Sequence, residues 1–103
     1  MQIVETPIFT RRIGKVMSEE EYRHLQVALR DNPELGTQVG GKLRKVRWGS
    51  TGRGKRGGAR VIYYWAQANG VVLMLFAFAK NEQEDLTPEQ TRVLRALVEA
   101  EYP

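Results

Sequence analysis

The apolar residues in the first third of the chain predict a short strand followed by two helices. Residues 2–5 (QIVE) favour the strand, and Pro7 suits the first turn of a helix, where its missing N–H is not needed. The apolar residues that then recur at helical spacing are Ile8, Phe9, Ile13 and Val16. Gly14 weakens this segment, so we expect a short or broken helix.

A capping box at residues 18–21 (SEEE) predicts the start of the second helix, because the serine and the last glutamate can satisfy each other's backbone N–H groups. Its apolar positions are Tyr22, Leu25, Ala28 and Leu29. Asn32-Pro33 ends the helix, since the residue before a proline avoids the α region. Residues 34–42 (ELGTQVGGK) indicate a loop.

Alternation with a period of two predicts strands in the middle of the chain. Residues 43–48 alternate, with Leu43, Lys45 and Arg47 on one face and Arg44, Val46 and Trp48 on the other. Residues 60–67 are rich in β-branched and aromatic side chains and favour a second strand. Asn69-Gly70 predicts a hairpin turn, because both residue types tolerate positive φ. Residues 71–79 are apolar on both faces, which is typical of a central strand covered on both sides.

A second capping box, residues 87–90 (TPEQ), starts a last helix that we expect to reach about Glu101. Its apolar stripe is Val93, Leu94, Leu97 and Val98. The predicted order is β, α, α, β, β, β, α. We therefore expect a single α+β domain over residues 1–103, with an antiparallel sheet that is mixed at its first strand, two N-terminal helices and one C-terminal helix.

The charges are strongly separated along this chain. No acid lies within residues 35–81, and that segment holds nine of the 16 basic residues. The rest holds seven bases and twelve acids, so a net charge of +4 hides a basic half. Eight of the nine bases fall within residues 42–60, which favours binding to polyanions because Lys and Arg replace the counterions of phosphates.

Composition narrows the possible classes of protein. The absence of cysteine excludes disulfides and thiolate metal sites and is compatible with a reducing compartment. The N-terminus does not resemble a signal peptide, and the longest apolar run, residues 71–79, is too short for a membrane helix. We expect a soluble, cytoplasmic protein without a membrane partner.

Nucleotide, metal and histidine chemistry are poorly supported. Residues 49–55 (GSTGRGK) fit a phosphate-loop spacing, but a strand and not a helix is expected next, so a basic hairpin loop over residues 49–58 is the better interpretation. His24 is the only histidine, which excludes a histidine acid–base pair. The nearby acids Glu82, Glu84 and Asp85 suit the start of the last helix, and we expect no metal and no cofactor.

The basic residues have the chemistry needed to cleave RNA without a metal. The 2′-hydroxyl must lose a proton, the phosphorane needs positive charge around it, and the leaving oxygen needs a proton. Arginine supplies fixed positive charge, and a lysine among like charges loses its proton more easily. Lys45, Arg47, Arg60 and Lys80 are sufficient in type. Tyr64 shares a strand face with Arg60 and offers a ring on which a base could stack.

Three segments together resemble a known family: LRKVRW at 43–48, the basic loop ending GGARVIYYW at 57–65, and the strand ending FAKNEQEDLT at 78–87. They are similar to the RelE/ParE superfamily of bacterial toxins, in its HigB-like branch. The resemblance covers nearly the whole chain and implies a RelE-like fold. It also implies a ribosome-dependent endoribonuclease that cuts mRNA and inhibits translation. A cognate antitoxin, expected to be a helix-turn-helix protein, would neutralise the toxin, and operator DNA would be met only through the antitoxin complex.

The resemblance also assigns residues. Lys45 and Arg47 match the basic pair of the family's second strand, Arg60 opens the next strand, and Lys80 ends the hairpin. Asn81 stands where RelE members have a further arginine, and Thr87 lies near the position of a catalytic tyrosine. The general base therefore stays open among Lys45, Lys80 and Glu82. Further RNA contacts are expected from Arg44, Arg53, Lys55, Arg56 and Tyr64.

Two other functions remain open at this point. ParE relatives share the fold but inhibit gyrase, so the fold alone does not decide the activity. A non-catalytic RNA- or DNA-binding module would also need a basic surface, and it would bind with strong salt dependence.

Overall fold

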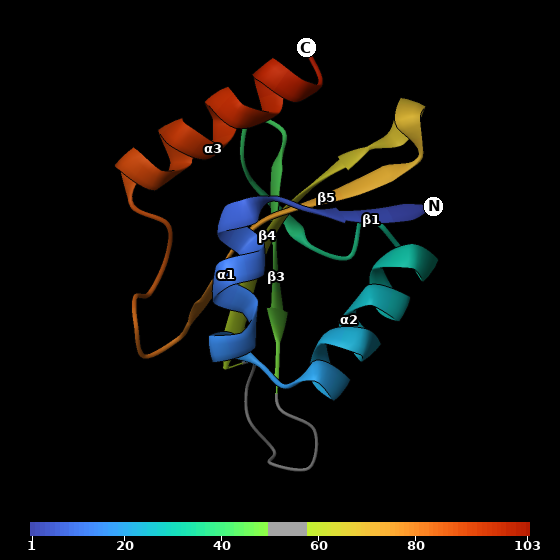
Figure 1. The fold of residues 1–103 in the computed structure, drawn as a ribbon. Coiled ribbons are helices and arrows are strands. Elements are labelled where there is room, and N and C mark those ends of the chain that lie inside the picture. The colour runs from blue at the N-terminus through green and yellow to red at the C-terminus, as the bar shows by residue number, and fades with distance from the viewer. Residues whose placement is uncertain (50–57) are drawn as a thin grey trace.

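The structure is a computed structural model that describes residues 1–49 and 58–103, and in these residues three helices pack on a five-stranded sheet (Figure 1). The elements in chain order are β1 (Gln2–Glu5), α1 (Pro7–Val16), α2 (Glu19–Asp31), β2 (Thr37–Gly40), β3 (Leu43–Trp48), β4 (Ala59–Ala66), a 3-10 turn (Gln67–Asn69), β5 (Val71–Ala79) and α3 (Pro88–Glu101). The predicted α+β class is confirmed.

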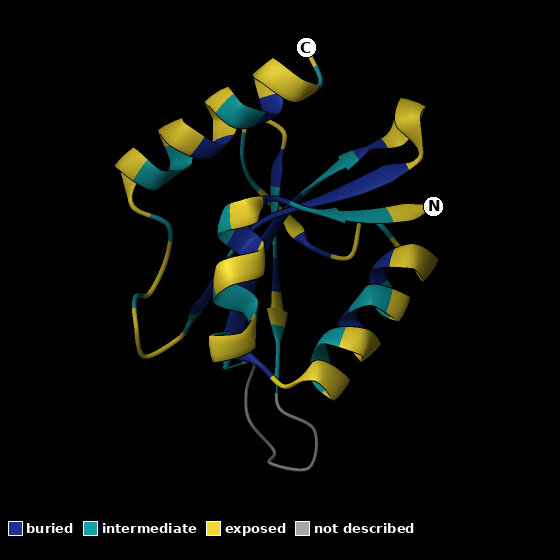
Figure 2. Ribbon diagram, in the orientation of Figure 1, coloured by how far each residue is buried: buried dark blue, intermediate teal, exposed yellow. Residues whose placement is uncertain are grey.

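The sheet has the strand order β1-β5-β4-β3-β2. β1 runs parallel to β5, and the other neighbouring strands are antiparallel, so the sheet is mixed at its first strand as predicted. β5 lies between β1 and β4, and apart from the partly exposed Phe76 and Ala79 its side chains are buried (Figure 2). This agrees with the central strand expected from its apolar run.

Each face of the sheet has its own apolar core. On one face, α1 and α2 contribute Phe9, Leu25 and Leu29, which pack with Val61 and Met74. On the other face, α3 contributes side chains that pack on those of β3, β4 and β5; the buried members include Leu43, Ile62, Leu75, Leu94 and Val98. We call these the α1/α2 face and the α3 face.

Three local predictions need correction. Residues 37–40, expected within a loop, form the edge strand β2, because a turn at Gly40 and Gly41, both with positive φ, folds them back onto β3. The helix expected to be short or broken at Gly14 is short but unbroken over the ten residues of α1, so only the break is wrong. The turn before β5 is longer than a two-residue hairpin, and only its Gly70 has positive φ (66°).

Both capping boxes form as predicted. The Ser18 hydroxyl accepts from the N–H of Glu21 at 3.1 Å, and the Ser18 N–H donates to the Glu21 carboxylate at 2.8 Å. Thr87 and Gln90 make the same reciprocal pair at the start of α3. The second box matters for function, because it fixes the segment between β5 and α3.

Candidate functional site

Strand pairing gathers basic residues on the α3 face of the sheet. In the antiparallel register, Arg47 of β3 lies directly opposite Arg60 of β4, and Lys45 lies opposite Ile62. Leu43 and Ile62 belong to the core of the α3 face. Because side chains alternate along a strand, Lys45, Arg47 and Arg60 share that face. We call these three residues the cationic cluster.

The pair of Arg47 and Arg60 is unfavourable for folding. Like charges directly opposite each other on neighbouring strands destabilise a sheet. Arg60 is also buried, with only 7% of its surface exposed. Burial and the neighbouring charge of Arg47 both lower the pKa of the Arg60 guanidinium, and the carboxylate of Asp85 opposes them. An arrangement that costs stability in this way is typical of a functional site.

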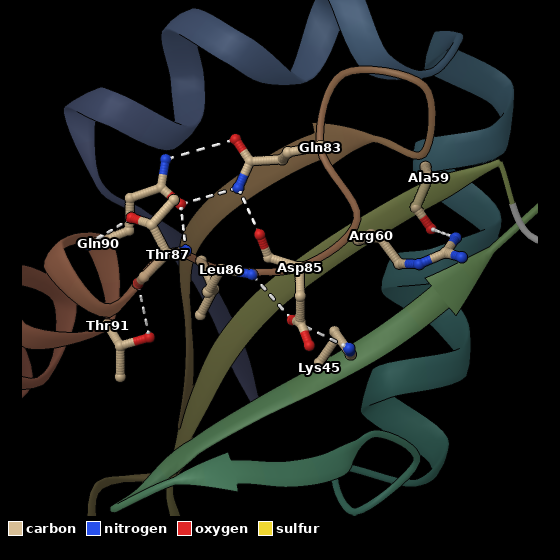
Figure 3. A network of polar contacts seen from close by, with 9 residues as sticks. All are labelled: Lys45, Ala59, Arg60, Gln83, Asp85, Leu86, Thr87, Gln90 and Thr91. Carbon is tan, nitrogen blue, oxygen red and sulfur yellow. Dashed lines mark hydrogen bonds and ion pairs between the residues drawn. The ribbon is translucent and has the colours of Figure 1, made fainter.

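Lys45 is held by an acid from the segment between β5 and α3. Its Nζ donates to Oδ1 of Asp85 at 3.1 Å, and the same oxygen accepts the N–H of Leu86 at 2.8 Å (Figure 3). The hydrogen bond from Leu86 and the contact with Lys45 hold the pKa of Asp85 below its ordinary value. Sequence reasoning assigned Asp85 to the dipole of the last helix and missed this ion pair, which spans forty residues.

A network of amides and the helix cap fixes the backbone around Asp85. Gln83 Nε2 donates to the carbonyl oxygen of Asp85 and to Oε1 of Gln90, each at 2.8 Å (Figure 3). Oε1 of Gln90 also accepts the N–H of Thr87 at 3.0 Å, and Oγ1 of Thr87 accepts the N–H of Gln90 at 3.0 Å. The hydroxyl of Thr87 therefore caps α3. The capping-box pattern was visible in the sequence, but the part played by Gln83 was not.

Lys80 lies just beyond the end of β5 and is exposed. Its N–H donates to the carbonyl of Gly58 at 2.8 Å, which continues the pairing of β4 with β5. Phe78 belongs to the α3 face, so the alternation places Lys80 on that face as well. Lys80 therefore lies at the end of the hairpin that carries Arg60, and its part in the site stays a prediction.

Glu82, one of the three residues predicted as a base, is engaged elsewhere. Its carboxylate pairs with Arg12 of α1 and accepts the N–H of Ala79 at 3.2 Å. The hydrogen bond from Arg12 is the main cause that lowers the pKa of Glu82. Arg12 itself is anchored to the carbonyl of Ala77 at 2.7 Å. A carboxylate held in this way is a weak proton acceptor, so the structure does not support Glu82 as a general base.

Two residues predicted to bind RNA lie apart from the cluster. Arg44 is on the α1/α2 side of β3, where Nη1 donates to the carbonyl of Gly36 at 2.7 Å. Tyr64 lies on the α3 face but near the end of α3, with its ring 5.8 Å from that of Tyr102 and Lys42 Nζ 5.8 Å from its centroid. The alternation and the length of β4 separate these side chains from Arg60, and RNA contacts by Arg44 and Tyr64 stay predictions. Arg53, Lys55 and Arg56 lie outside the described residues.

A shallow hollow of about 550 Å³ borders the cluster, lined by Lys45 and Arg47 together with Leu35, Thr37, Val39, Val46 and Trp48. It lies at the edge of the sheet where β2 begins, since Thr37, the first residue of β2, pairs with Lys45. Its volume falls within the usual range for small-ligand sites. Two cations of the cluster therefore line this hollow.

In the described part of the chain, no group of three or more His, Asp and Glu side chains could hold a metal ion together. No helix there is long and apolar enough to cross a membrane.

The sequence matches the family described as the RelE toxin of the RelE/RelB toxin–antitoxin system, over residues 1–101. The match includes both N-terminal helices, the sheet and α3, so it covers every element that builds the cationic cluster. This chain belongs to the RelE toxin family of toxin–antitoxin systems.

Proposed function

We propose that this toxin is an endoribonuclease that cuts mRNA on the ribosome and so inhibits translation. The observation that carries the proposal is the placement of Arg47 directly opposite the buried Arg60, with Lys45 beside them on one face. A buried, fixed positive charge is most useful where negative charge builds during a reaction. Membership of the RelE toxin family supports the same activity.

The proposed chemistry is an attack by the ribose 2′-oxygen on the adjacent phosphorus. The new bond joins O2′ to phosphorus, and the bond from phosphorus to O5′ breaks. The 2′-hydroxyl gives its proton to a base, and the O5′ leaving group receives one. Arg47 and Arg60 offset the extra charge of the phosphorane through paired N–H donors, so this route needs no metal ion.

The surroundings favour a lysine as the proton carrier. Glu82 is tied to Arg12 and Ala79, whereas Lys45 and Lys80 lie on the face of the cluster. We propose Lys45 and Lys80 as the base and the acid, without assigning which residue plays which part.

The proposal includes the partners of the toxin. A cognate antitoxin, which we expect to be a helix-turn-helix protein as in the HigB-like branch, would neutralise it. Contact with operator DNA would pass through that complex. We place the toxin in the cytoplasm, because its proposed target is the translating ribosome.

Expression in a bacterial host tests the proposal. The wild type should arrest growth and leave mRNAs cut within their coding regions, while Arg60→Ala and Lys80→Ala should each relieve the arrest. Lys80 is exposed, so its variant should fold normally even if the loss of the buried Arg60 destabilises the protein. Circular dichroism checks folding, and Arg23→Ala on the exposed side of α2 is the control.

Other outcomes would point to other functions. DNA-damage signalling with intact mRNAs would indicate a gyrase inhibitor of the ParE kind. Salt-dependent RNA binding without cleavage or growth arrest would indicate a binding module. Full toxicity in both the Arg60 and Lys80 variants would overturn the proposed site.

A further inference from the structure

We propose that Asp85 is an internal counter-ion, which occupies the place of one RNA phosphate in the resting site and must be displaced when RNA binds. This inference rests on the proposed RNA-binding function of the cationic cluster. It assigns to Asp85 a role in specificity, since an RNA binds only if its phosphates compete with this carboxylate.

The first observation is the position of the carboxylate. Asp85 Oδ1 lies 3.1 Å from Lys45 Nζ, and the charge of Asp85 also acts on Arg60. A phosphodiester carries one negative charge and presents oxygen acceptors, as a carboxylate does. Lys and Arg bind both groups through the same charge-assisted hydrogen bonds. Asp85 thus makes a contact with Lys45 that a bound phosphate would make.

The second observation is that another anion can replace the Asp85 carboxylate at Lys45. The Asp85 side chain is 61% exposed, whereas that of Lys45 is 19% exposed. An exposed ion pair contributes little to stability, because water and salt screen its charges. Water and competing anions therefore reach the carboxylate, while the lysine stays in place below it.

The third observation is that the backbone carrying Asp85 is fixed. Gln83 and the capping box of Thr87 and Gln90 hold the segment through hydrogen bonds of 2.8–3.0 Å (Figure 3). The carboxylate is thus returned to the same place whenever RNA leaves. Its displacement needs only a side-chain rotation.

The consequence is a lower affinity for free RNA. In the resting state the charge of Asp85 offsets one of the three cations of the cluster. A strand held against the whole surface, as on a ribosome, supplies enough phosphates to displace it. A single phosphate or a loosely bound strand competes poorly.

The test compares Asp85→Asn with Glu84→Gln. The two substitutions change the net charge equally and lie at adjacent positions. Glu84, unlike Asp85, makes no hydrogen bond or ion pair with residues 1–49 and 58–103, and its side chain is exposed. Asparagine keeps an oxygen that can accept the Leu86 N–H. The probe is a short fluorescent single-stranded RNA without cleavable 2′-hydroxyls, titrated by anisotropy at several salt concentrations.

We expect Asp85→Asn to bind this RNA about threefold to tenfold more tightly than Glu84→Gln at low salt. The slope of log K against log salt should steepen by about 0.7, the value for one more phosphate contact on a single strand. Equal affinity and equal slope in the two variants would overturn the proposal. Weaker binding by Asp85→Asn would also overturn it, since Asp85 would then position Lys45 for RNA.

A second readout separates this inference from the proposed function. Inorganic phosphate should raise the melting temperature of Asp85→Asn more than that of Glu84→Gln, because it replaces the missing counter-ion. If no variant binds the free RNA, the phosphate shift alone decides the counter-ion role, while growth arrest and mRNA cutting in the bacterial host test the proposed function separately. Equal shifts in the two variants would rule that role out.

Discussion

The two faces of the sheet use the same alternation of side chains for opposite purposes. On the α1/α2 face, buried side chains such as Phe9, Val61 and Met74 form a core closed by two helices. On the α3 face, one helix covers the part of the sheet around Ile62 and Leu75, and the cationic cluster continues beyond it. The cover provided by helices, and not the strands themselves, therefore separates core from site.

Polar groups differ between the faces in the same way. On the α1/α2 side, Trp48 Nε1 donates to the carbonyl of Glu21 at 3.0 Å, and the Tyr63 hydroxyl donates to that of Pro33 at 2.7 Å. Their bonds serve the fold. On the α3 side, Arg47 and Arg60 face each other as like charges. Natural proteins concentrate such conflicts at functional sites, where stability is given up for activity.

The largest effect on stability should come from removing a large side chain from the core of the α1/α2 face. Phe9 is fully buried and its ring lies 5.6 Å from that of Tyr22, so Phe9→Ala should lower the free energy of unfolding by about 3–5 kcal/mol. Urea denaturation measures this free energy of unfolding. Val93→Ala, on the exposed side of α3, should change stability by less than about 0.5 kcal/mol. Similar losses in both would contradict the contrast between core and surface.

A glycine beneath β3 tests how tightly the site is supported. A Cβ on Gly36 would lie 2.8 Å from the carbonyl oxygen of Lys45 and 3.0 Å from the Tyr63 ring. Gly36→Ala should therefore cost about 1–3 kcal/mol and displace the strand that carries Lys45. Thermal melting measures the loss. Gly14→Ala, which meets no atom within 4 Å in α1, should instead stabilise by about 0.5–1 kcal/mol.

Removing the hydroxyl of Tyr63 tests how much the polar contacts of the α1/α2 face contribute to stability. It accepts the N–H of Gly36 at 2.8 Å and donates to the carbonyl of Pro33 at 2.7 Å. Tyr63→Phe removes both bonds and leaves a buried N–H without its partner, so stability should fall by about 1–3 kcal/mol. The ring is retained, so the cationic cluster should keep its arrangement. An unchanged unfolding free energy would show that water replaces the hydroxyl.

The smallest effect should be seen on acidification. Contact with Arg12 lowers the pKa of Glu82 from 4.5, so the stability that this carboxylate contributes is present above 4.5 and is lost as pH falls through the lowered pKa. Glu82→Gln should lack that part of the acid dependence. Urea midpoints measured at a series of pH values compare the two proteins. Parallel curves below 4.5 would contradict the pairing with Arg12.

Much of the site follows from short-range pattern. The period of two in residues 43–48 and 60–66 places Lys45, Arg47 and Arg60 on the same face once the strands pair. The same period places Arg44 on the other face of β3. Arg44 was expected to contact RNA only because it belongs to the basic segment of residues 42–60. Both capping boxes were readable for the same reason, since their partners lie three residues apart.

What the sequence did not reveal depends on contacts between distant segments. The edge strand β2 ends in a glycine and forms because β3 offers it a partner. The ion pair of Lys45 with Asp85 depends on how the segment before α3 crosses the sheet. The close approach of Gly36 to Lys45 and Tyr63 likewise exists only in the folded chain. No local pattern encodes these contacts.

The most direct test of the cationic cluster compares two arginines on one strand. Arg47 and Arg44 are three residues apart on β3, face opposite sides of the sheet and change the net charge equally when replaced by glutamine. Single-turnover cleavage of mRNA on programmed ribosomes measures both variants below their melting temperatures. Arg47→Gln should slow cleavage about a hundredfold, whereas Arg44→Gln should cleave at close to the wild-type rate. Equal losses in the two variants would mean that total charge, and not the α3 face, carries the activity.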